Sequence, residues 1–304
     1  MNQDNYHIPA LLPETLSLLD VNPSGIYVDA TFGGGGHSRA IADRLNEHGR
    51  LFAFDQDADA ISHAEPHPRI TLVHANFRYM ADFLRYYGVE GNVDGILADL
   101  GVSFHHFDDG ERGFSFRSPD GALDMRMNRG QRLTAADLLN NLPAERLTEI
   151  IRLYGELKSA PRIAAAIVKA RESKPFATIA DFTDTVTPLL ARGREKKELA
   201  PLFQALRIEV NDEMGALRDF LEECAPALRP GGRLAIITYH SLEDRMVKNL
   251  MRTGNIFGTQ STDIYGNSHS PWQPVTRKPV TPSAEEVELN PRSRSAKLRV
   301  AQKI

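Results

Sequence analysis

The chain of 304 residues has only one cysteine, Cys224, and no long uninterrupted apolar run. A single thiol excludes an intrachain disulfide and fits a reducing compartment, so we expect a cytoplasmic protein. A membrane span needs about 20 consecutive apolar residues, and none is present. The polar residues 1–5 are also unlike a secretory signal. We therefore expect no membrane partner.

An excess of positive charge is also lacking, since 36 Lys and Arg stand against 40 Asp and Glu, for a net charge of −4. This excludes a polycation, and any binding of nucleic acid must use a local patch. With 41% hydrophobic and 25% charged residues, the composition is that of a globular protein. The length suits one large domain or two modest ones.

The most informative stretch is a run of four glycines, Gly33, Gly34, Gly35 and Gly36. It lies between a predicted strand over residues 26–30 and a predicted helix from residue 38. Without Cβ atoms this backbone can bend sharply and come close to a ligand. The first N–H groups of the helix would face that ligand. Turns use glycine too, so the loop alone is weak evidence for a nucleotide site.

The next predicted strand strengthens this interpretation. Residues 51–54 are apolar and end in Asp55, about 20 residues beyond the first glycines, where doubly wound folds place an acid on a ribose diol. A dinucleotide and S-adenosylmethionine both fit this pattern. However, His37 stands near the place of a third glycine, and an acid, Asp29, precedes the loop. Both features favour S-adenosylmethionine, whose positive sulfonium and ammonium groups suit carboxylates.

Strands are also predicted at 70–74, 93–100 and 233–238, with a last, antiparallel strand at 298–301. Their alternation with helices predicts an α/β fold with a mostly parallel, Rossmann-like sheet. Ligands bind such sheets beyond the carboxyl ends of the strands. The glycine loop, Asp55, Phe77 and Asp99 all fall at such ends, so we expect them to converge.

From about residue 108 to residue 204 the strand pattern gives way to helical patterns, at 135–140, 144–154, 162–171, 179–190 and 197–206. We predict an inserted all-helical subdomain over residues 108–204. It is rich in cations, but interleaved acids also allow a solvated helical face. The best candidates for contacting phosphates are Arg192, Arg194, Lys196 and Lys197.

Ordered motifs run almost from end to end of the chain. They are HxPxLLxE at 7–14, DATFGGGGHS at 29–38, DLGVS at 99–103, RGFSF at 112–116, LDMRM at 123–127, YGE at 154–156, FQALRIxVN at 203–211, HSLEDR at 240–245 and NPRSRS at 290–295. With them the chain resembles the bacterial 16S ribosomal RNA cytosine-N4 methyltransferases, the MraW or RsmH family. The resemblance implies a class I methyltransferase domain over residues 1–107 and 205–304. Residues 108–204 would then be a substrate-recognition domain.

The resemblance also implies that S-adenosylmethionine is bound by Gly35, Gly36, His37, Asp55, Phe77 and Asp99, beside Gly33 and Gly34 of the loop. One departure is notable, because residues 104–108 read FHHFD. The family's glutamine contact to the cofactor would fall on His106. An imidazole can replace the amide, but the contact becomes sensitive to pH near the histidine pKa. We predict no metal site at His105 and His106, because no third ligand is in view.

Methyl transfer from a sulfonium is an in-line displacement, and the N4 amine of cytosine is a poor nucleophile because its lone pair is delocalised into the ring. An acceptor for the N4 hydrogen would localise that lone pair and later take the proton. Asp99 is placed for this role or for binding the cofactor. The other candidates follow strand ends and are Ser103, Tyr239, His240 and Glu243. His240 could equally cap the next helix.

The expected partner is 16S rRNA within the small ribosomal subunit, and the sequence is compatible with a homodimer. The target cytosine must be unpaired or flipped out to be reached. Candidates for stacking on it are Phe104, Phe114, Phe116 and Tyr239. Candidates for holding phosphates are Arg207, Arg245, Arg292 and Arg294, which could instead pair with acids of the fold.

Three other interpretations compete with an rRNA methyltransferase. A non-catalytic RNA-binding or assembly protein is disfavoured by the intact glycine loop, Asp55 and Asp99. A nicotinamide-dependent oxidoreductase is disfavoured by the loop pattern. A small-molecule methyltransferase would leave the inserted basic helical region unexplained.

Overall fold

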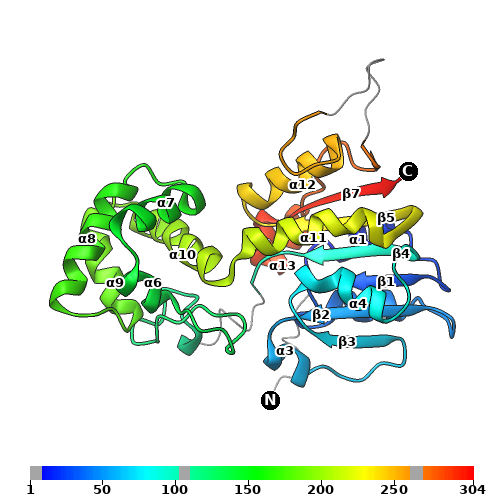
Figure 1. Cartoon of the computed structure of the whole chain (residues 1–304), viewed down its shortest axis with the longest axis horizontal. Coiled ribbons are helices and arrows are strands. Elements are labelled where there is room, and N and C mark those ends of the chain that lie inside the picture. Colours follow the sequence, from blue (N-terminus) through cyan, green and yellow to red (C-terminus); the bar gives the residue numbers. More distant parts are fainter. Residues whose placement is uncertain (1–8, 103–109, 261–269) are drawn as a thin grey trace. The chain divides into compact units, whose positions relative to one another are not determined.

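The computed structural model describes residues 9–102, 110–260 and 270–304. The chain forms two compact units (Figure 1). One consists of the described residues up to Gly101 together with Met214–Ile304, and the other is Val102–Glu213. The second unit includes more residues than the range of 108–204 that we predicted from the sequence. One reason is that α10 (Glu195–Asn211) continues beyond residue 204 and adds Leu206 and Val210 to that unit's core.

The described residues of the first unit contain seven strands, β1 (Ile26–Asp29), β2 (Arg50–Asp55), β3 (Ile70–His74), β4 (Val93–Asp99), β5 (Leu228–Thr238), β6 (Trp272–Pro274) and β7 (Lys297–Lys303). These strands form one sheet in the order β3-β2-β1-β4-β5-β7-β6. The first five are parallel, and β7 runs antiparallel to both β5 and β6. This confirms the predicted mostly parallel, Rossmann-like class I architecture and its antiparallel last strand.

Two details of the sheet differ from the expectation. The strand β6 was not predicted, because its three residues are too few to show a period. The strand predicted at 233–238 begins earlier, at Leu228, because β5 includes an irregularity at residues 229–232, where the register with β4 shifts and Gly231 has a φ of 82°. Pairing on both sides of this irregularity makes it part of the strand.

Alternate residues of the strands face opposite sides of the sheet, and each side has its own core. Val28, Ile96 and Ile236 belong to the core cluster that includes residues of α4 (Met80–Tyr86), α11 (Glu213–Ala227) and α12 (Ser241–Thr253). Tyr27 and Leu97 are sequence neighbours of Val28 and Ile96, and they belong to the cluster that includes residues of α1 (Leu12–Leu19) and α2 (Gly36–Ala42). The strands read as near-continuous apolar runs because both faces are covered.

The helices connected with the sheet are α1 (Leu12–Leu19), α2 (Gly36–Ala42), α3 (Ala58–Ser62), α4 (Met80–Tyr86), α11 (Glu213–Ala227), α12 (Ser241–Thr253) and α13 (Ala284–Leu289). Two 3₁₀ turns, η1 (Phe77–Tyr79) and η4 (Pro291–Ser295), complete this part. In Figure 1, α4 and α11 lie on the same face of the sheet, which agrees with their shared core cluster.

The second unit contains η2 (Gly110–Arg112), α6 (Ala135–Asn141), α7 (Ala144–Gly155), α8 (Ala160–Ser173), α9 (Ile179–Val186), η3 (Thr187–Leu189) and α10. Capping boxes at Thr134 and Thr178 fix the starts of α6 and α9. The five helices share one apolar core. This matches the helical patterns of the sequence, although the predicted helix over 179–190 continues beyond α9 only as the 3₁₀ turn η3.

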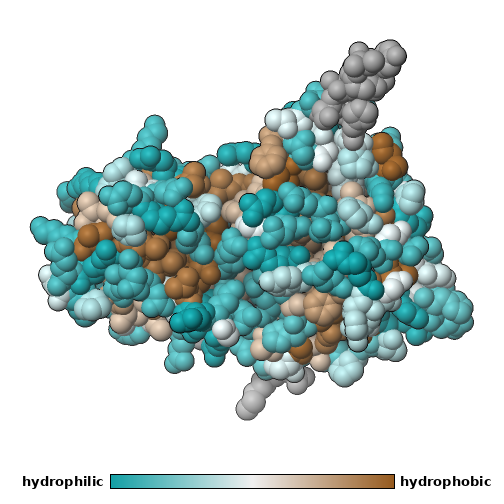
Figure 2. Space-filling view, in the orientation of Figure 1, coloured by the Kyte–Doolittle hydropathy of each residue, from teal (hydrophilic) through white to brown (hydrophobic). Residues whose placement is uncertain are grey.

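The surface is mixed in character. On the face seen in Figure 2, apolar residues gather in patches that hydrophilic residues interrupt. None of the helices in the described part of the chain is both long and apolar enough to cross a membrane.

Candidate active site

The strand order locates the candidate site. The chain adds β2 and β3 on one side of β1 and then β4 on the other, so the order reverses between β1 and β4. Ligands of open α/β sheets bind outside the carboxyl ends of the strands at such a reversal. Asp29, Asp55 and Asp99 are the last residues of β1, β2 and β4. Three neighbouring parallel strands therefore each end in a carboxyl group at the same edge of the sheet.

The glycine loop connects β1 to α2. Gly33 and Gly35 have φ angles of 51° and 76°, a region that favours glycine, and Gly34 lies between them in the turn. The N–H of Gly33 donates to Asp55 Oδ2 over 2.8 Å, which ties the loop to the end of β2. At Gly36 an added Cβ would lie 2.4 Å from Pro9 Cγ. The predicted loop thus has the shape and tight packing that exclude side chains.

Asp29 holds the residues that precede and follow the four glycines. Its side chain is fully buried. Its Oδ2 accepts a hydrogen bond from Ser38 Oγ over 2.6 Å, and Oδ1 accepts one from the N–H of Thr31 over 3.0 Å. Burial raises the pKa of Asp29 to about 6, although the hydrogen bonds from Ser38 and Thr31 act in the opposite direction.

His37 is a buried neutral imidazole. Its Nε2 lies 3.2 Å from the carbonyl oxygen of Ala10, and since a carbonyl only accepts, Nε2 carries the hydrogen. Burial lowers the pKa of His37 to about 4, so the ring is neutral at pH 7. Its unprotonated Nδ1 then faces Asp99 Oδ2 at 3.7 Å, too far for a hydrogen bond. Near neutral pH this contact is therefore not an ion pair.

Asp99 is held from two sides. Its backbone N–H donates to Thr31 Oγ1 over 2.7 Å, and its Oδ1 accepts a hydrogen bond of 2.8 Å from the Tyr239 hydroxyl. Burial raises the pKa of Asp99 to about 7, with a smaller contribution from the nearby negative charges of Asp29 and Glu243. The hydrogen bond from Tyr239 opposes this rise. Asp99 can therefore gain or lose a proton near neutral pH.

Asp55 and Phe77 mark the ends of β2 and β3. Asp55 Oδ1 accepts a hydrogen bond of 2.8 Å from the N–H of Asp57, so each of its oxygens holds a backbone amide. Phe77 begins η1 and is half-buried, with its ring edge-on to Phe220 at a centroid distance of 5.3 Å. Both residues lie at the edge of the sheet where the sequence placed them.

His240 caps α12 in the structure. Its Nδ1 accepts from the N–H of Glu243 at 3.5 Å, and Glu243 Oε2 accepts from the N–H groups of Tyr239 and His240. This is a capping box, the alternative that the sequence left open. Glu243 is buried and committed to the same cap. Four further residues of the predictions, Ser103, Phe104, His105 and His106, lie outside the described residues.

The comparison with known proteins decides the family. The model of the MraW methylase family matches residues 4–304. The chain belongs to the MraW methylase family. It is therefore a methyltransferase, and S-adenosylmethionine is its methyl donor.

Relatives of this MraW methylase are similar over their whole length. A protein of Parabacteroides distasonis named "Ribosomal RNA small subunit methyltransferase H" is 58% identical over 299 residues, 98% of each chain. Proteins of the same name from Bacteroides thetaiotaomicron and Porphyromonas gingivalis are 58% and 55% identical, and each match covers 98% of this chain and 97% of the relative. A solved structure, a putative rRNA-methylase from Clostridium thermocellum, is 13% identical with a TM-score of 0.43 and covers 98% of this chain and 100% of that one.

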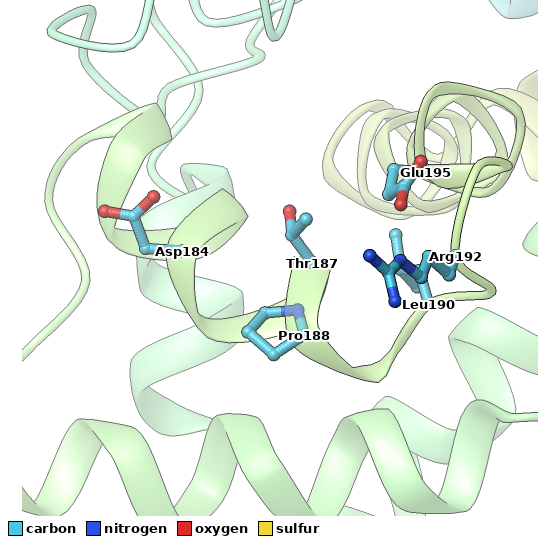
Figure 3. Close-up of a pocket in the computed structure, with 6 residues that line it drawn as sticks. All are labelled: Asp184, Thr187, Pro188, Leu190, Arg192 and Glu195. Carbon is cyan, nitrogen blue, oxygen red and sulfur yellow. The ribbon is translucent and has the colours of Figure 1, made fainter.

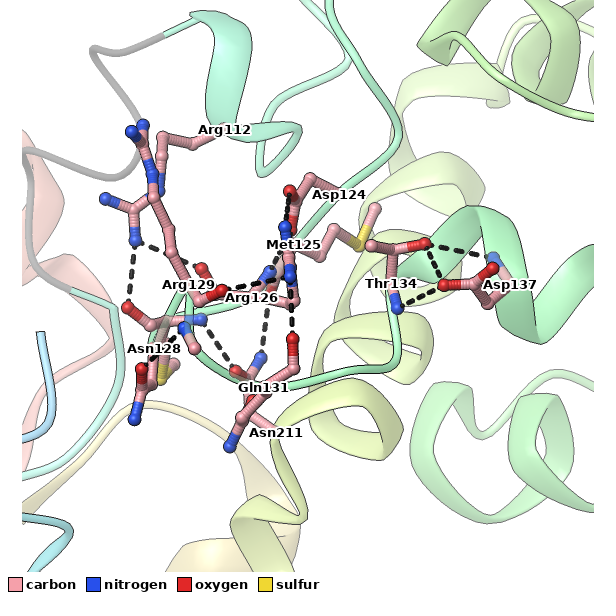
Figure 4. A network of polar contacts seen from close by, with 12 residues as sticks. Arg112, Asp124, Met125, Arg126, Asn128, Arg129, Gln131, Thr134, Asp137 and Asn211 are labelled. Atoms are coloured by element: carbon pink, nitrogen blue, oxygen red, sulfur yellow. Dashed lines mark hydrogen bonds and ion pairs between the residues drawn. The ribbon is translucent and has the colours of Figure 1, made fainter.

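Several cations of the helical unit of this MraW methylase hold its own loops together (Figure 4). Arg112 is buried, and its Nη2 donates to the carbonyl oxygens of Arg126 and Met127. Arg126 makes two hydrogen bonds to the carboxylate of Asp124 and donates to two further carbonyl oxygens. These two arginines belong to the many cations of the helical region, and their hydrogen bonds stabilise its loops.

Some of the predicted RNA contacts have partners within the helical unit. Arg207 forms a two-pronged ion pair with Glu213, with distances of 2.7 and 2.8 Å. Phe114 is buried, and Phe116 packs edge-on against Phe203 at 5.6 Å. These surroundings support a core role for both phenylalanines instead of stacking on the target base.

Sequence reasoning missed Thr31 and the pairing of Asp99 with Tyr239. Thr31 bonds Asp29 through its N–H and Asp99 through its hydroxyl, so it connects the ends of β1 and β4. The sequence contains one signal for it, because an Asp often bonds the backbone two residues on. Tyr239 had been a candidate only for stacking or as a base.

Proposed function

We propose that this chain transfers the methyl group of S-adenosylmethionine to the exocyclic N4 of a cytosine in 16S rRNA, within the small ribosomal subunit in the cytoplasm. Membership in the MraW methylase family supports the reaction class. We assign the catalytic role from one observation: Tyr239 holds the Asp99 carboxyl group at the end of β4, and the pKa of this group is near neutrality. The helical unit would recognise the RNA.

The residues at the sheet edge fit this methyl donor. Neither Asp29 nor Asp99 forms an ion pair with a Lys or Arg of residues 9–102, 110–260 or 270–304. Two carboxyl groups without a cationic partner suit a ligand that carries a sulfonium and an ammonium charge. Gly33, Gly34, Gly35, Gly36 and His37 would form the wall against which it binds, together with Asp55 and Phe77 at the neighbouring strand ends.

We assign to Asp99 the role of accepting the proton that N4 of the cytosine loses. Ionised, it accepts a hydrogen bond from the N4–H of the cytosine, which localises the nitrogen lone pair. As the new N–C bond forms, the C–S bond breaks and its electron pair stays on sulfur. The proton lost by N4 passes to the Asp99 carboxylate. Tyr239 orients that carboxylate, and the neutral ring of His37 leaves its charge uncompensated.

The direct test is transfer of labelled methyl groups to 30S subunits, free 16S RNA and DNA, with identification of the product nucleoside. We expect label in N4-methylcytidine from the small-subunit rRNA. The Asp99→Asn variant should lose turnover by about 10²-fold or more, whereas Asp82→Asn, which changes an exposed carboxylate on α4, should not. Absence of label in cytidine would overturn the proposed reaction. An active Asp99→Asn variant would remove Asp99 from the proton transfer.

A further inference from the structure

A compact group of cations lies in the turn between η3 and α10 and in the first turn of α10. We define the basic loop as residues 191–197, of which residues 195–197 begin α10. It contains Arg192, Arg194, Lys196 and Lys197, and all four side chains are exposed. Gly193, between the two arginines, has a φ of 78°, and an added Cβ there would find no atom within 4 Å. The tip of the loop therefore stands in open space.

The two nearby acids hold the loop in shape instead of neutralising its cations. Glu195 Oε1 accepts from the N–H of Gly193 over 2.8 Å, and Glu198 Oε2 accepts from the N–H of Ala191 over 3.2 Å. The N–H of Arg194 closes the turn onto the carbonyl of Ala191. None of the four cationic side chains forms an ion pair with a described residue. Their charges are thus presented on a fixed backbone.

Most other basic side chains of this unit do have partners. Arg146, Lys174 and Arg207 form ion pairs, and Arg171 donates to the carbonyl oxygens of Leu139 and Leu142. Exposed cations without an ion pair among the described residues also occur on α7, α8 and the turn between them. These are Arg152, Lys158, Arg162 and Lys169, spread over 152–169. What distinguishes the basic loop is the density of its unpaired charge, four cations in six residues.

A hollow lies beside the loop (Figure 3). It is lined by Asp184, Thr187, Pro188, Leu190, Arg192 and Glu195. Because two carboxylates line this hollow, an anion is not favoured inside it. The cations instead favour an extended anion that runs along the outside of the loop and meets several charges in turn. A nucleic acid backbone, with regularly spaced phosphates, is such a partner.

We propose that the basic loop binds consecutive backbone phosphates of the rRNA substrate and so contributes to affinity rather than to the chemical step. The proposal rests on the proposed function, because it takes the RNA as substrate. Arginine and lysine contacts to phosphates position an RNA without reading its sequence. The loop should therefore act on binding and on its salt dependence, and leave turnover at saturation unchanged.

The test compares two full-length variants that each lose four positive charges. One is Arg192→Gln/Arg194→Gln/Lys196→Gln/Lys197→Gln. The matched control is Arg152→Gln/Lys158→Gln/Arg162→Gln/Lys169→Gln. Binding to free 16S RNA is measured over a range of salt concentrations, and steady-state methyl transfer is measured on 30S subunits. Far-ultraviolet circular dichroism and thermal unfolding report whether each variant is folded.

We expect the loop variant to bind RNA on the order of ten- to hundredfold more weakly near 0.15 M salt. Its slope of log affinity against log salt should be shallower by about 3, since each single-strand phosphate contact contributes about 0.7. KM should rise and kcat should be retained, and the control should change far less. Equal losses in both variants would mean that net charge alone matters, and this would overturn the proposal.

Three other outcomes are distinguishable. Weaker activity on 30S subunits with unchanged binding to free RNA would assign the loop to a ribosomal protein instead, against the proposal. Failure of the unaltered protein to methylate cytidine would refute the proposed function. If the unaltered protein is active and the loop variant matches it in KM and salt slope, only the loop proposal fails.

Discussion

The Tyr239 hydroxyl donates a hydrogen bond of 2.8 Å to Asp99 Oδ1. The two residues follow β5 and end β4, which are adjacent parallel strands. An ionised carboxylate accepts such a bond better than a protonated one, so the bond favours the charged form of Asp99. It thereby limits the rise in pKa that burial causes, and keeps the carboxyl group able to titrate near neutral pH.

The Tyr239→Phe variant should therefore shift the acid limb of the methyl-transfer rate to higher pH. Without the hydroxyl the pKa of Asp99 rises above about 7, and less of the ionised base is present at pH 7. We expect kcat/KM for S-adenosylmethionine at pH 7, which depends on the ionisation of the enzyme before this ligand binds, to fall by up to about tenfold and to recover substantially at alkaline pH. The measurement is kcat/KM for S-adenosylmethionine with 30S subunits from pH 5.5 to 9.5.

Tyr86→Phe is the matched control, because Tyr86 is 82% exposed on α4, and its pH profile should match that of the unaltered protein. If Tyr239→Phe lowers kcat/KM for S-adenosylmethionine equally at every pH, Tyr239 orients the site without setting the charge of Asp99. An unchanged profile would also argue against Asp99 as the titrating base.

Much of this edge of the sheet is predictable because it depends on local pattern. Apolar runs that end in Asp29, Asp55 and Asp99 define strands and their carboxyl ends, and parallel pairing brings those ends together. The glycine loop follows from the absence of Cβ atoms. These features need only residues within one strand and its turn.

The rest depends on contacts between distant segments, which no local pattern shows. Tyr239 reaches Asp99 across 140 positions, and His37 is kept neutral by burial and bonded to Ala10. Asn211, 84 and 86 positions from its partners, holds a loop of the helical unit. His240 could be read as a base or as a cap, and only the position of Glu243 favours the cap.

Binding of S-adenosylmethionine should release protons near neutral pH. Burial leaves Asp29 and Asp99 with pKa values of about 6 and about 7, so both are partly protonated there. A cationic ligand placed beside them favours their ionised forms and lowers both pKa values. We expect release of a fraction of a proton between pH 6 and 7.5, measured by calorimetry in buffers of different ionisation enthalpy.

S-adenosylhomocysteine lacks the sulfonium charge and should release fewer protons under the same conditions. In Asp99→Asn the release on binding S-adenosylmethionine should decrease. Equal release by both ligands would indicate that the sulfonium does not lie near these carboxyl groups.

The Asn211 side chain should contribute to the free energy of unfolding of the helical unit. Its Oδ1 accepts from the N–H of Met127, and its Nδ2 donates to the carbonyl of Met125, both over 2.8 Å (Figure 4). The side chain is buried. Asn211→Ala leaves these backbone groups without that partner, so we expect the free energy of unfolding to fall by about 2 to 4 kcal/mol in urea titrations.

Asn141→Ala serves as its control, because the exposed Asn141 makes one hydrogen bond to the carbonyl of Asp137 on the same helix. It should lower the free energy of unfolding by less than about 1 kcal/mol. Similar losses in the two variants would mean that the network around residues 124–131 carries no special stability.

Asp29 should make the protein less stable as the pH rises from about 4 to about 6. Its pKa is about 6 in the folded chain and 3.8 in the unfolded one, so the folded state binds the proton more tightly in this window. Stability then falls as the proton is lost, by roughly 3 kcal/mol in total, and the penalty is complete above pH 6. Asp29→Asn removes this titration, although it also alters the bond to Ser38 by an amount that does not depend on pH.

The decisive quantity is therefore the difference in unfolding free energy between the unaltered protein and Asp29→Asn, followed by urea titration from pH 4 to pH 7.5. It should change by roughly 3 kcal/mol in favour of the variant as the pH rises. The exposed Asp82, changed to Asn, should give no such trend. If the curves for the unaltered protein and Asp29→Asn run parallel, Asp29 titrates in the folded chain as it does in the unfolded one. The buried charge of Asp29 beside the glycine loop would then not destabilise the folded chain.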